Sequence, residues 1–346
     1  MVNIVQTSKA FEALEPVWRA LEASDNVRIF QTFNWCRTAW LASLEKDSHN
    51  KLWIIHWRGA EDNVILPTYI DKKGVLRFIY DTDSDTCDAL YKRGCNHNLA
   101  YYEIAKAIMA EHIIKGVWLQ KMRGTSEALN YLGVMLRGGL AYKDNAFSWI
   151  DVAAGDDFIA SQKHMKSKDR ADLKNLLRRS DKYALKIVSS TAGDKFPESE
   201  LFSLRDAMRK CGKRDSVYFS DDSIWFVKEL YDKGVCDVAI LTEGAKVSAA
   251  NVLLKKDNRI LSWVFLYNDP HASTALYIKY FCETKASHGY VFDFGVGVYS
   301  YKIGTFRPKI SATYSFRWSN SHMAFVRNSL ACSVRFLKDY VKSFRK

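Results

Sequence analysis

Side chains that can carry acid–base chemistry gather between residues 293 and 301. Asp293 lies in the apolar stretch YVFDF, and Tyr299 and Tyr301 follow it after two glycines. A carboxylate can orient an ammonium group or accept its proton, and a phenol can give a proton to a leaving group. The alternatives are that Asp293 caps the following turn and that both tyrosines pack in a core. This segment therefore favours proton transfer at an amine.

Two further polar residues could take part in such chemistry. Asn251 lies in the apolar stretch 246–255 and could hold an acceptor, although it could also be an ordinary polar residue of an edge strand. His164 is the histidine placed to act as a base near the expected cleft, and its alternative is a surface group. Neither residue defines a site by itself.

The elements around these residues have the order of a meander followed by a crossover. Stretches 235–243, 245–256 and 259–267 are apolar and separated by short Gly- or Asp-containing turns, which predicts three antiparallel strands. A helix over 272–288 and a strand over 290–294 follow. Strand, helix and strand in that order predict that 259–267 and 290–294 are parallel. Ligands bind where such strands separate at their C-terminal ends.

This order, with Phe292-Asp293-Phe294-Gly295, Gly297, Tyr301-Lys302 and Gly304, resembles the acetyltransferase domain of the GNAT superfamily. It is most similar to the Fem-like and cellulose-biosynthesis-type branch, which the basic stretch LKNLLRR at 173–179 also matches. The resemblance covers roughly the last two-thirds of the chain. It implies an α/β fold with mixed sheets and two tandem GNAT-like domains. A degenerate domain would span 1–152, and a complete acyltransferase domain with a basic junction helix would span 153–346.

The resemblance also implies roles for individual residues. Fem-like enzymes use the lysine of the Tyr-Lys pair on the transition-state oxygen, which gives this role to Lys302; the alternative is a surface lysine. Acyl-CoA is the implied cosubstrate, and no metal is implied. Its pantetheine amides would pair with the free edge of strand 259–267, and its pyrophosphate would meet unpaired amides and hydroxyls at the following helix. These expectations select Trp263, Phe265, Leu266 and Tyr267 for pantetheine, and His271, Ser273 and Thr274 for pyrophosphate.

The helix start departs from the pattern of acetyl-CoA enzymes. Those enzymes usually carry a glycine-rich loop before this helix, whereas NDPHASTALY contains no glycine. Fem-type relatives lack the same loop and use aminoacyl-tRNA, but some relatives that acylate amino sugars still use acyl-CoA. Both donors therefore stay open.

A basic segment joins the two halves of the chain. Residues 156–182 are rich in Lys and Arg but keep leucines at helical spacing, which predicts an amphipathic helix. With a net charge of +12 and a pI near 9.2, the chain should attract phosphate-bearing ligands. Lys166, Arg170 and Arg178, with Lys168 and Arg179, are candidate contacts to a nucleotide diphosphate between the domains. The alternative is a solvated face.

The sequence lacks the motifs that are typical of several other classes of functional site. No Walker loop, G-x-S-x-G elbow or dinucleotide fingerprint occurs, and DTDSDTCD lacks the glycine and glutamate of a calcium loop. Seven scattered cysteines without C-x-x-C spacing predict reduced thiols and no zinc. The absence of a signal peptide and of any long apolar stretch predicts a soluble cytoplasmic protein without a membrane partner.

These observations lead to one expected function and two alternatives. The expected function is transfer of an acyl group from acyl-CoA to the amino group of a dTDP- or UDP-linked amino sugar, for synthesis of a surface polysaccharide such as lipopolysaccharide or capsule. The first alternative is a Fem-like transferase that depends on aminoacyl-tRNA, in which the partner is a nucleic acid. The second is a GNAT-like binding module without activity.

The remaining pattern predicts the first domain and the chain end. Helices are expected over 30–46, 101–115, 126–136 and 322–344, and strands over 51–57, 63–70, 75–80, 116–122 and 147–152.

Overall fold

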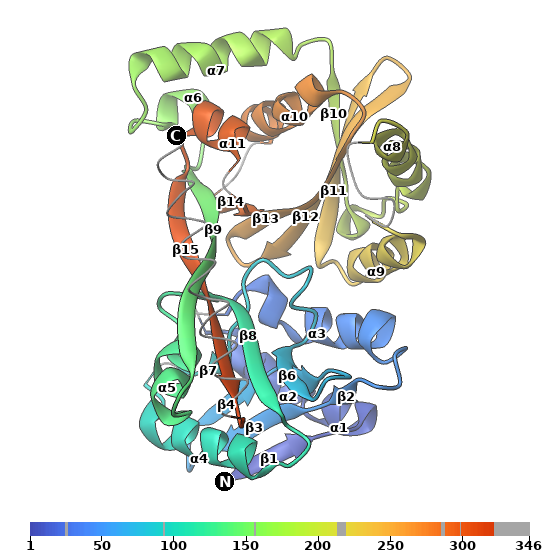
Figure 1. Ribbon diagram of the computed structural model, residues 1–346. Helices are drawn as coiled ribbons and strands as arrows, with labels where there is room; N and C mark the ends of the chain where they lie inside the picture. The colour runs from blue at the N-terminus through green and yellow to red at the C-terminus, as the bar shows by residue number, and fades with distance from the viewer. Residues whose placement is uncertain are drawn as a thin grey trace. The chain divides into compact units, whose positions relative to one another are not determined.

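The computed structural model describes residues 1–24, 27–92, 94–155, 157–212, 219–284, 288–297 and 299–321. The chain forms two compact units (Figure 1). One comprises Met1–Asn145 with the described residues from Ala312 onward, and the other comprises Ala146–Ser311. Each unit combines strands with helices, which confirms the mixed α/β fold class.

The second unit is built on a mixed sheet. Its strand order is β10-β11-β12-β13-β14-β9, and all neighbours are antiparallel except β13 and β14, which are parallel. The predicted meander and the predicted parallel pair are therefore confirmed. The strands are β9 (Leu140–Val152), β10 (Ala184–Val188), β11 (Cys236–Glu243), β12 (Lys246–Lys256), β13 (Arg259–Tyr267) and β14 (Tyr290–Val296).

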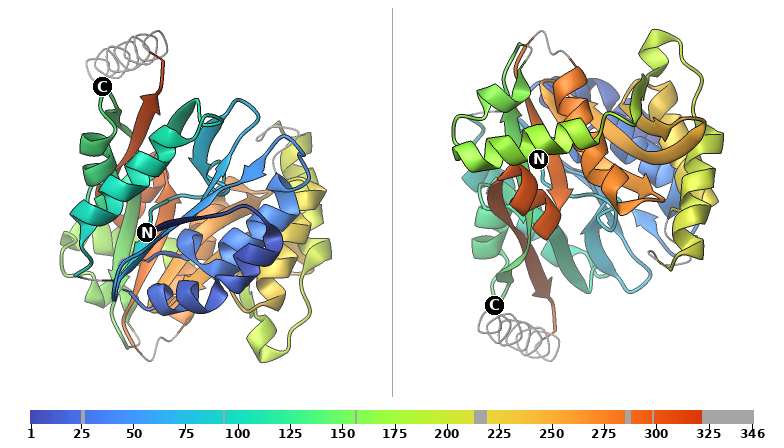
Figure 2. Two further views of the ribbon diagram at one scale, coloured as in Figure 1. Left: turned by 90° about the horizontal axis from the view of Figure 1, so that it is seen from below. Right: turned by 90° about the horizontal axis from the view of Figure 1, so that it is seen from above.

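Helices pack on this sheet in two groups. Helix α10 (Pro270–Glu283) contacts β11, β12 and β13, and α7 (Ser167–Arg179) contacts α10. Helices α8 (Glu198–Lys210) and α9 (Asp221–Asp232) contact the same strands from the other side (Figure 1). The two short helices α6 (Phe158–Ser161) and α11 (Ser300–Phe306) contact α7, which crosses over α10 in the right-hand view of Figure 2. A short 3-10 turn, η3, spans Ser190–Ala192.

The core under α10 is aromatic. The ring of Tyr277 lies 5.0–5.9 Å from four phenylalanine rings, measured between centroids. Aromatic rings at these separations in tilted and edge-on geometry add attraction beyond the area they bury. The rings are those of Phe265, Phe292, Phe294 and Phe306.

Two helices of this unit differ from the prediction. The helix expected over 156–182 is broken into α6 and α7, because residues 162–166 leave the helical conformation before Lys166 begins α7 in an extended one. Helix α11 was not predicted at all. It has only seven residues, one of them a glycine, and so it is too short to show a helical pattern of hydrophobic residues.

The first unit contains two groups of strands. One has the order β1-β3-β4-β7 and the other β15-β8-β6-β5-β2. The strands expected over 51–57 and 63–70 are each divided, because Pro67 lacks an N–H for the ladder and Trp53 pairs instead with the backbone of Thr68. The strands are β1 (Val2–Val5), β2 (Lys51–Leu52), β3 (Ile54–Arg58), β4 (Asn63–Leu66), β5 (Thr68–Ile70), β6 (Val75–Phe78), β7 (Leu90–Tyr91), β8 (Gly116–Arg123) and β15 (Lys309–Ser319).

Helices cover the strands of this unit. The helix expected over 30–46 is α3 continued by one turn of π-helix, η2. The helix expected over 322–344 lies outside the described residues. The elements are α1 (Ser8–Ala13), α2 (Glu15–Glu22), η1 (Ile29–Gln31), α3 (Phe33–Ala39), η2 (Trp40–Leu44), α4 (His97–Ala110) and α5 (Glu127–Met135). None of the helices in the described ranges is long and apolar enough to cross a membrane.

Candidate active site

The strands β13 and β14 separate after a short parallel ladder. They pair from Arg259↔Val291 to Leu261↔Asp293, and no later pair joins them in the described part of the chain. Both strands continue, β13 to Tyr267 and β14 to Val296. A bulge distorts β13 at this point, because Val252 pairs with Val264 and Leu253 with Ser262, so that Trp263 is the extra residue in the register. Ser262 and Phe294 are therefore the first residues beyond the ladder, a position called the divergence point below.

Lys302 lies at the divergence point. Its side chain belongs to α11 and is buried, with 5% of the residue exposed. The Nζ atom donates to the carbonyl oxygen of Phe294 at 2.5 Å and lies 5.0 Å from the ring centroid of Tyr299. A buried ammonium needs such partners because it has lost its water. The alternative of a surface lysine is wrong.

The other three acidic or phenolic candidates lie on β14, in the case of Asp293, and at the start of α11. Tyr299 and Tyr301 are 51% and 39% exposed, so the alternative of core packing is wrong for both. Their rings stack with centroids 6.0 Å apart. Asp293 Oδ1 accepts a hydrogen bond from the N–H of Gly295 at 2.8 Å, which is the turn-capping contact predicted as its alternative. The structure thus places Lys302, Tyr299 and Tyr301 together on one short helix and its entry.

The path of the chain into α11 depends on Gly297. Its φ is +103°, a region that side chains with a Cβ rarely adopt. A Cβ at this position would lie 2.6 Å from Cε2 of Tyr299. Glycine is therefore required for Tyr299 to fold back toward Lys302.

Asn251 is more buried than the sequence indicated. Strand β12 lies between β11 and β13, so the alternative of an edge strand is wrong. Asn251 is fully buried, and its Oδ1 accepts a hydrogen bond from Ser262 Oγ at 3.1 Å. Ser262 Oγ is also 2.8 Å from the hydroxyl of Tyr277. These three side chains form a polar cluster that starts at the divergence point.

A carboxylate occupies the start of α10. Asp269 is the N-cap, and its Oδ1 accepts from the N–H of His271 at 2.9 Å while its Oδ2 accepts from the hydroxyl of Tyr183 at 2.9 Å. The hydroxyls of Ser273 and Thr274 donate to helix carbonyl groups. The structure therefore does not show the expected set of unpaired donors for a pyrophosphate. The first backbone N–H of α10, that of His271, already donates to the carboxylate of Asp269.

The pKa of Asp269 reflects this position. Partial burial acts to raise it, but the hydrogen bonds from His271 and Tyr183, helped by nearby positive charge, outweigh that effect. The net result is a pKa below the ordinary value of an aspartate. Asp269 is consequently ionised near neutral pH and would repel a phosphate group.

The four residues expected to meet pantetheine divide between the two faces of β13. Phe265 faces α10, with its ring 5.0 Å from that of Tyr277. Trp263 makes an edge contact with Phe226 of α9 at 5.7 Å, and Leu266 is fully buried. The N–H of Tyr267 donates to Sδ of Met208 at 3.3 Å. Among described residues, the edge of β13 that faces away from β12 is unpaired with β14 from Ser262 onward.

The basic segment is presented by α6 and α7. A cavity of about 480 Å³ lies between these helices, and Lys163, Arg170 and Lys174 are its charged lining residues. Lys166 and Arg178 are exposed, whereas Arg170 is partly buried and donates to the backbone of Met165. On the opposite side of α7, Asp169 is paired with Arg307 at 2.9 Å. The cavity face of α7 is therefore positive and free of lining carboxylates.

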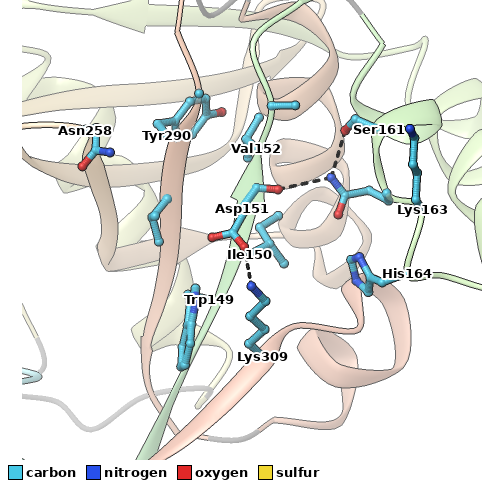
Figure 3. Close-up of a pocket in the computed structure, with 14 residues that line it drawn as sticks. Trp149, Ile150, Asp151, Val152, Ser161, Lys163, His164, Asn258, Tyr290 and Lys309 are labelled. Atoms are coloured by element: carbon cyan, nitrogen blue, oxygen red, sulfur yellow. Dashed lines mark hydrogen bonds and ion pairs between the residues drawn. The ribbon is translucent and has the colours of Figure 1, made fainter. Parts of the chain in front are cut away.

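His164 lies in a different place from the one expected. It lines a cavity of about 490 Å³ beside the N-terminal ends of β13 and β14, together with Asn258 and Tyr290 (Figure 3). Asp151 and Lys309 form an ion pair in the same cavity. Lys302, Tyr299 and Tyr301 are absent from its lining. His164 is thus not placed at the divergence point, because the break between α6 and α7 carries it to the other ends of the strands.

Sequence reasoning missed three residues of the site. Asp269 had a detectable signal, because an aspartate directly before a proline at the first helical position is a typical N-cap. Ser262 and Tyr277 had none, since each looks like an ordinary residue of an apolar element. Within the described ranges no group of three or more His, Cys, Asp or Glu side chains is arranged to hold a metal.

Comparisons with known proteins identify the fold. No family model and no curated protein matches the sequence. Among solved structures, L-PGS from Bacillus licheniformis is similar with a TM-score of 0.54 and 14% identity, covering 81% of this chain and 88% of that one. FemX is similar with a TM-score of 0.52 and 11% identity, covering 92% and 97%. A conserved protein of unknown function from Bacteroides thetaiotaomicron reaches 0.57 at 9% identity, covering 92% and 100%. At these identities the similarity concerns the fold alone.

Proposed function

We propose that this chain is an acyltransferase that moves an activated acyl group onto an amine at the divergence point. The observation that carries the proposal is the buried ammonium of Lys302, held 2.5 Å from the carbonyl oxygen of Phe294. A preorganised cation in a water-poor site stabilises an oxyanion far better than one in bulk water. This is also the role that the resemblance to Fem-like enzymes gives to the lysine of the Tyr-Lys pair.

The step we propose has four parts. The neutral amine nitrogen attacks the acyl carbonyl carbon, and the carbonyl oxygen becomes an oxyanion next to Lys302 Nζ. The oxyanion collapses, the new C–N bond remains, and the bond from carbon to the leaving oxygen or sulfur breaks. Asp293 accepts the proton that the amine loses. The leaving group takes a proton from Tyr299 or Tyr301, which are both exposed residues and can recover the proton from water.

The donor we propose is an aminoacyl-tRNA. Asp269 places a carboxylate where a CoA pyrophosphate would meet α10, which disfavours acyl-CoA. The acid-free cavity face of α7, with Arg170 and Lys174, suits a chain of phosphates. The fold is shared with FemX and with L-PGS, and the resemblance implies aminoacyl-tRNA as the donor of Fem-type proteins. These points together favour the donor that the sequence left as an alternative.

The second candidate is the acyl-CoA-dependent N-acyltransferase of a dTDP- or UDP-linked amino sugar. It is favoured by the unpaired edge of β13 from Ser262 onward, because pantetheine amides can pair with a free strand edge. It requires Asp269 to give up its contact with His271. An inactive binding module is the remaining alternative, and it predicts that Lys302 has no catalytic effect.

A thermal-shift series with the purified chain tests the donor. Ligands that bind only the native state raise its melting temperature by mass action. We expect stabilisation by bulk tRNA that falls steeply with salt, and none by coenzyme A or acetyl-CoA. Stabilisation by coenzyme A together with one of a panel of dTDP- and UDP-amino sugars would instead establish the second candidate.

A further inference from the structure

The polar cluster of Asn251, Ser262 and Tyr277 lies in an apolar environment. The three residues are 0%, 6% and 1% exposed, and they come from β12, β13 and α10. The Tyr277 ring packs against Phe265 and Phe294 at 5.0 and 5.3 Å. Buried polar groups in such surroundings cost free energy unless each one is hydrogen-bonded. The partners of each group in the cluster therefore matter.

The hydrogen bonds within the cluster can be assigned in order. Ser262 has one hydroxyl hydrogen, and it is donated to Asn251 Oδ1 at 3.1 Å. The 2.8 Å contact between Ser262 and Tyr277 must then be donated by the tyrosine hydroxyl. Asn251 Nδ2 remains, with two hydrogens and no acceptor among the described residues. The cluster thus holds one unused donor that is fully buried.

The position of the cluster relates this donor to the site. Ser262 is the first residue of β13 beyond the ladder, and Phe294, whose carbonyl oxygen holds Lys302, is the first of β14. The cluster and the Lys302 ammonium therefore flank the divergence point from its two strands.

We propose that Asn251, supported by Ser262 and Tyr277, is a specificity-determining residue for the acyl group, and that Asn251 Nδ2 donates to an oxygen atom carried by that group. The inference rests on the proposed acyl transfer. The substrate class it names is an acyl group with a hydroxyl or carbonyl oxygen beyond the reacting carbon, in preference to an alkyl group of the same shape. A site that pairs a substrate hydroxyl rejects the analogue without it, since its own polar group is then left unpaired.

The inference can be tested with pairs of acyl donors whose acyl groups differ at one position. One member of each pair carries a hydroxyl there, and the other carries a methyl group or a hydrogen. Threonyl- and valyl-tRNA form one pair, seryl- and alanyl-tRNA another, and 3-hydroxybutyryl- and butyryl-CoA serve if thioesters are the donors. For the native chain we expect kcat/KM to favour the hydroxyl member by about 10- to 100-fold. Equal use of both members would overturn the inference while leaving acyl transfer intact.

Substitutions separate specificity from folding. Asn251→Leu keeps a similar volume and removes the unused donor, so we expect an unchanged or higher melting temperature together with loss of the hydroxyl preference. Ser262→Ala should reduce the preference, and Ser248→Ala, a buried serine of the same strand β12, is the matched control that should keep it. A preference that survives in Asn251→Leu contradicts the assignment. If neither donor class is turned over, the proposed function fails and this inference fails with it.

Discussion

At the scale of single residues, the proposed function depends on how the surroundings of Lys302 hold its side chain. Its ammonium is fixed by the carbonyl oxygen of Phe294 and lies near the ring of Tyr299. Both contacts orient the charge, because the carbonyl oxygen and the ring face each attract the ammonium group. An oxyanion that forms beside Lys302 therefore meets a positive group that is already oriented and needs little rearrangement.

Replacing Lys302 tests this role. We expect Lys302→Met, which keeps the aliphatic stem, to lower kcat by roughly 10²- to 10³-fold with little change in KM. Lys186→Met removes an exposed lysine of β10 and should leave both parameters unchanged. Steady-state kinetics on the two variants, with melting temperatures to confirm folding, would make the measurement. A loss confined to KM would mean that Lys302 only binds substrate.

Asp269 gives a prediction about pH. Its pKa is lowered in the folded state, so its contribution to stability is present above its unfolded-state pKa of about 3.9 and is lost as pH falls through the lower folded-state pKa. We expect Asp269→Ala to reduce the free energy of unfolding by about 1 kcal/mol at neutral pH. The deficit should shrink below roughly pH 3.

Urea denaturation of the native chain and of Asp269→Ala, at neutral pH and below roughly pH 3, would measure how the stability deficit changes. Asp269→Asn is the control, because asparagine also caps helices and its effect does not depend on a charge. A deficit of equal size at both pH values would show that the Asp269 charge does not stabilise α10.

Single residues differed in how far the sequence predicted them. Asp293 and Lys302 could be selected because they lie in a recognisable stretch, and the turn-capping contact of Asp293 was predicted as its alternative role. The unused donor of Asn251 could not be predicted, since its burial depends on β13 and α10 packing around it. His164 was misplaced because its position depends on where one helix breaks.

At the scale of elements, the entry to α11 controls how Tyr299 approaches Lys302. Gly297 allows this entry with a φ of +103°, and a Cβ there would collide with the Tyr299 ring. The position of α11 is thus coupled to a single backbone conformation in the loop before it.

Two glycine substitutions compare this loop with the helix itself. Gly297→Ala should destabilise the chain by about 1 kcal/mol or more and lower kcat, since the Tyr299 ring must move. Gly304→Ala lies inside α11 with no atom within 4 Å of the added Cβ, and it should stabilise by roughly 0.5–1 kcal/mol. Thermal unfolding and kinetics on both would be measured together. Normal turnover by Gly297→Ala would separate Tyr299 from the reaction.

The positive face of helix α7 leads to a prediction about how RNA binding depends on salt concentration. If Arg170 and Lys174 each contact one phosphate of RNA, replacing either by glutamine should reduce the slope of log K against log salt by roughly 0.7–0.9. Lys186→Gln is the control on β10 and should not change the slope. Filter binding of bulk tRNA over a range of salt concentrations measures it. Identical slopes for all four proteins would remove α7 from the RNA-binding surface.

Elements that are long enough to show a clear hydrophobic pattern were predicted better than short elements. The meander β11–β12–β13 and its parallel partner β14 followed from apolar runs with clear turns. Helix α11 was missed because seven residues do not establish a period, and the break between α6 and α7 was missed because lysines and arginines favour a helix on both sides of it.

For the whole molecule, fold class and charge could be derived from the sequence, but the donor could not. The mixed α/β fold with one parallel strand pair follows from the order of strands and helices, and the net charge of +12 indicates anionic ligands in general. The choice between coenzyme A and tRNA depends on where individual charges lie. The carboxylate of Asp269 at α10 and the cations beside α7 now favour tRNA.

The most direct test of the central claim is a deacylation assay with both donor classes. The purified chain would be incubated with radiolabelled total aminoacyl-tRNA and with acetyl-CoA, each in the presence of a mixture of amine acceptors. We expect acceptor-dependent loss of label from tRNA, no release of free coenzyme A, and at least a roughly 10²-fold slower reaction with Lys302→Met. Release of coenzyme A at a rate that Lys302→Met does not change would contradict both the donor and the catalytic lysine.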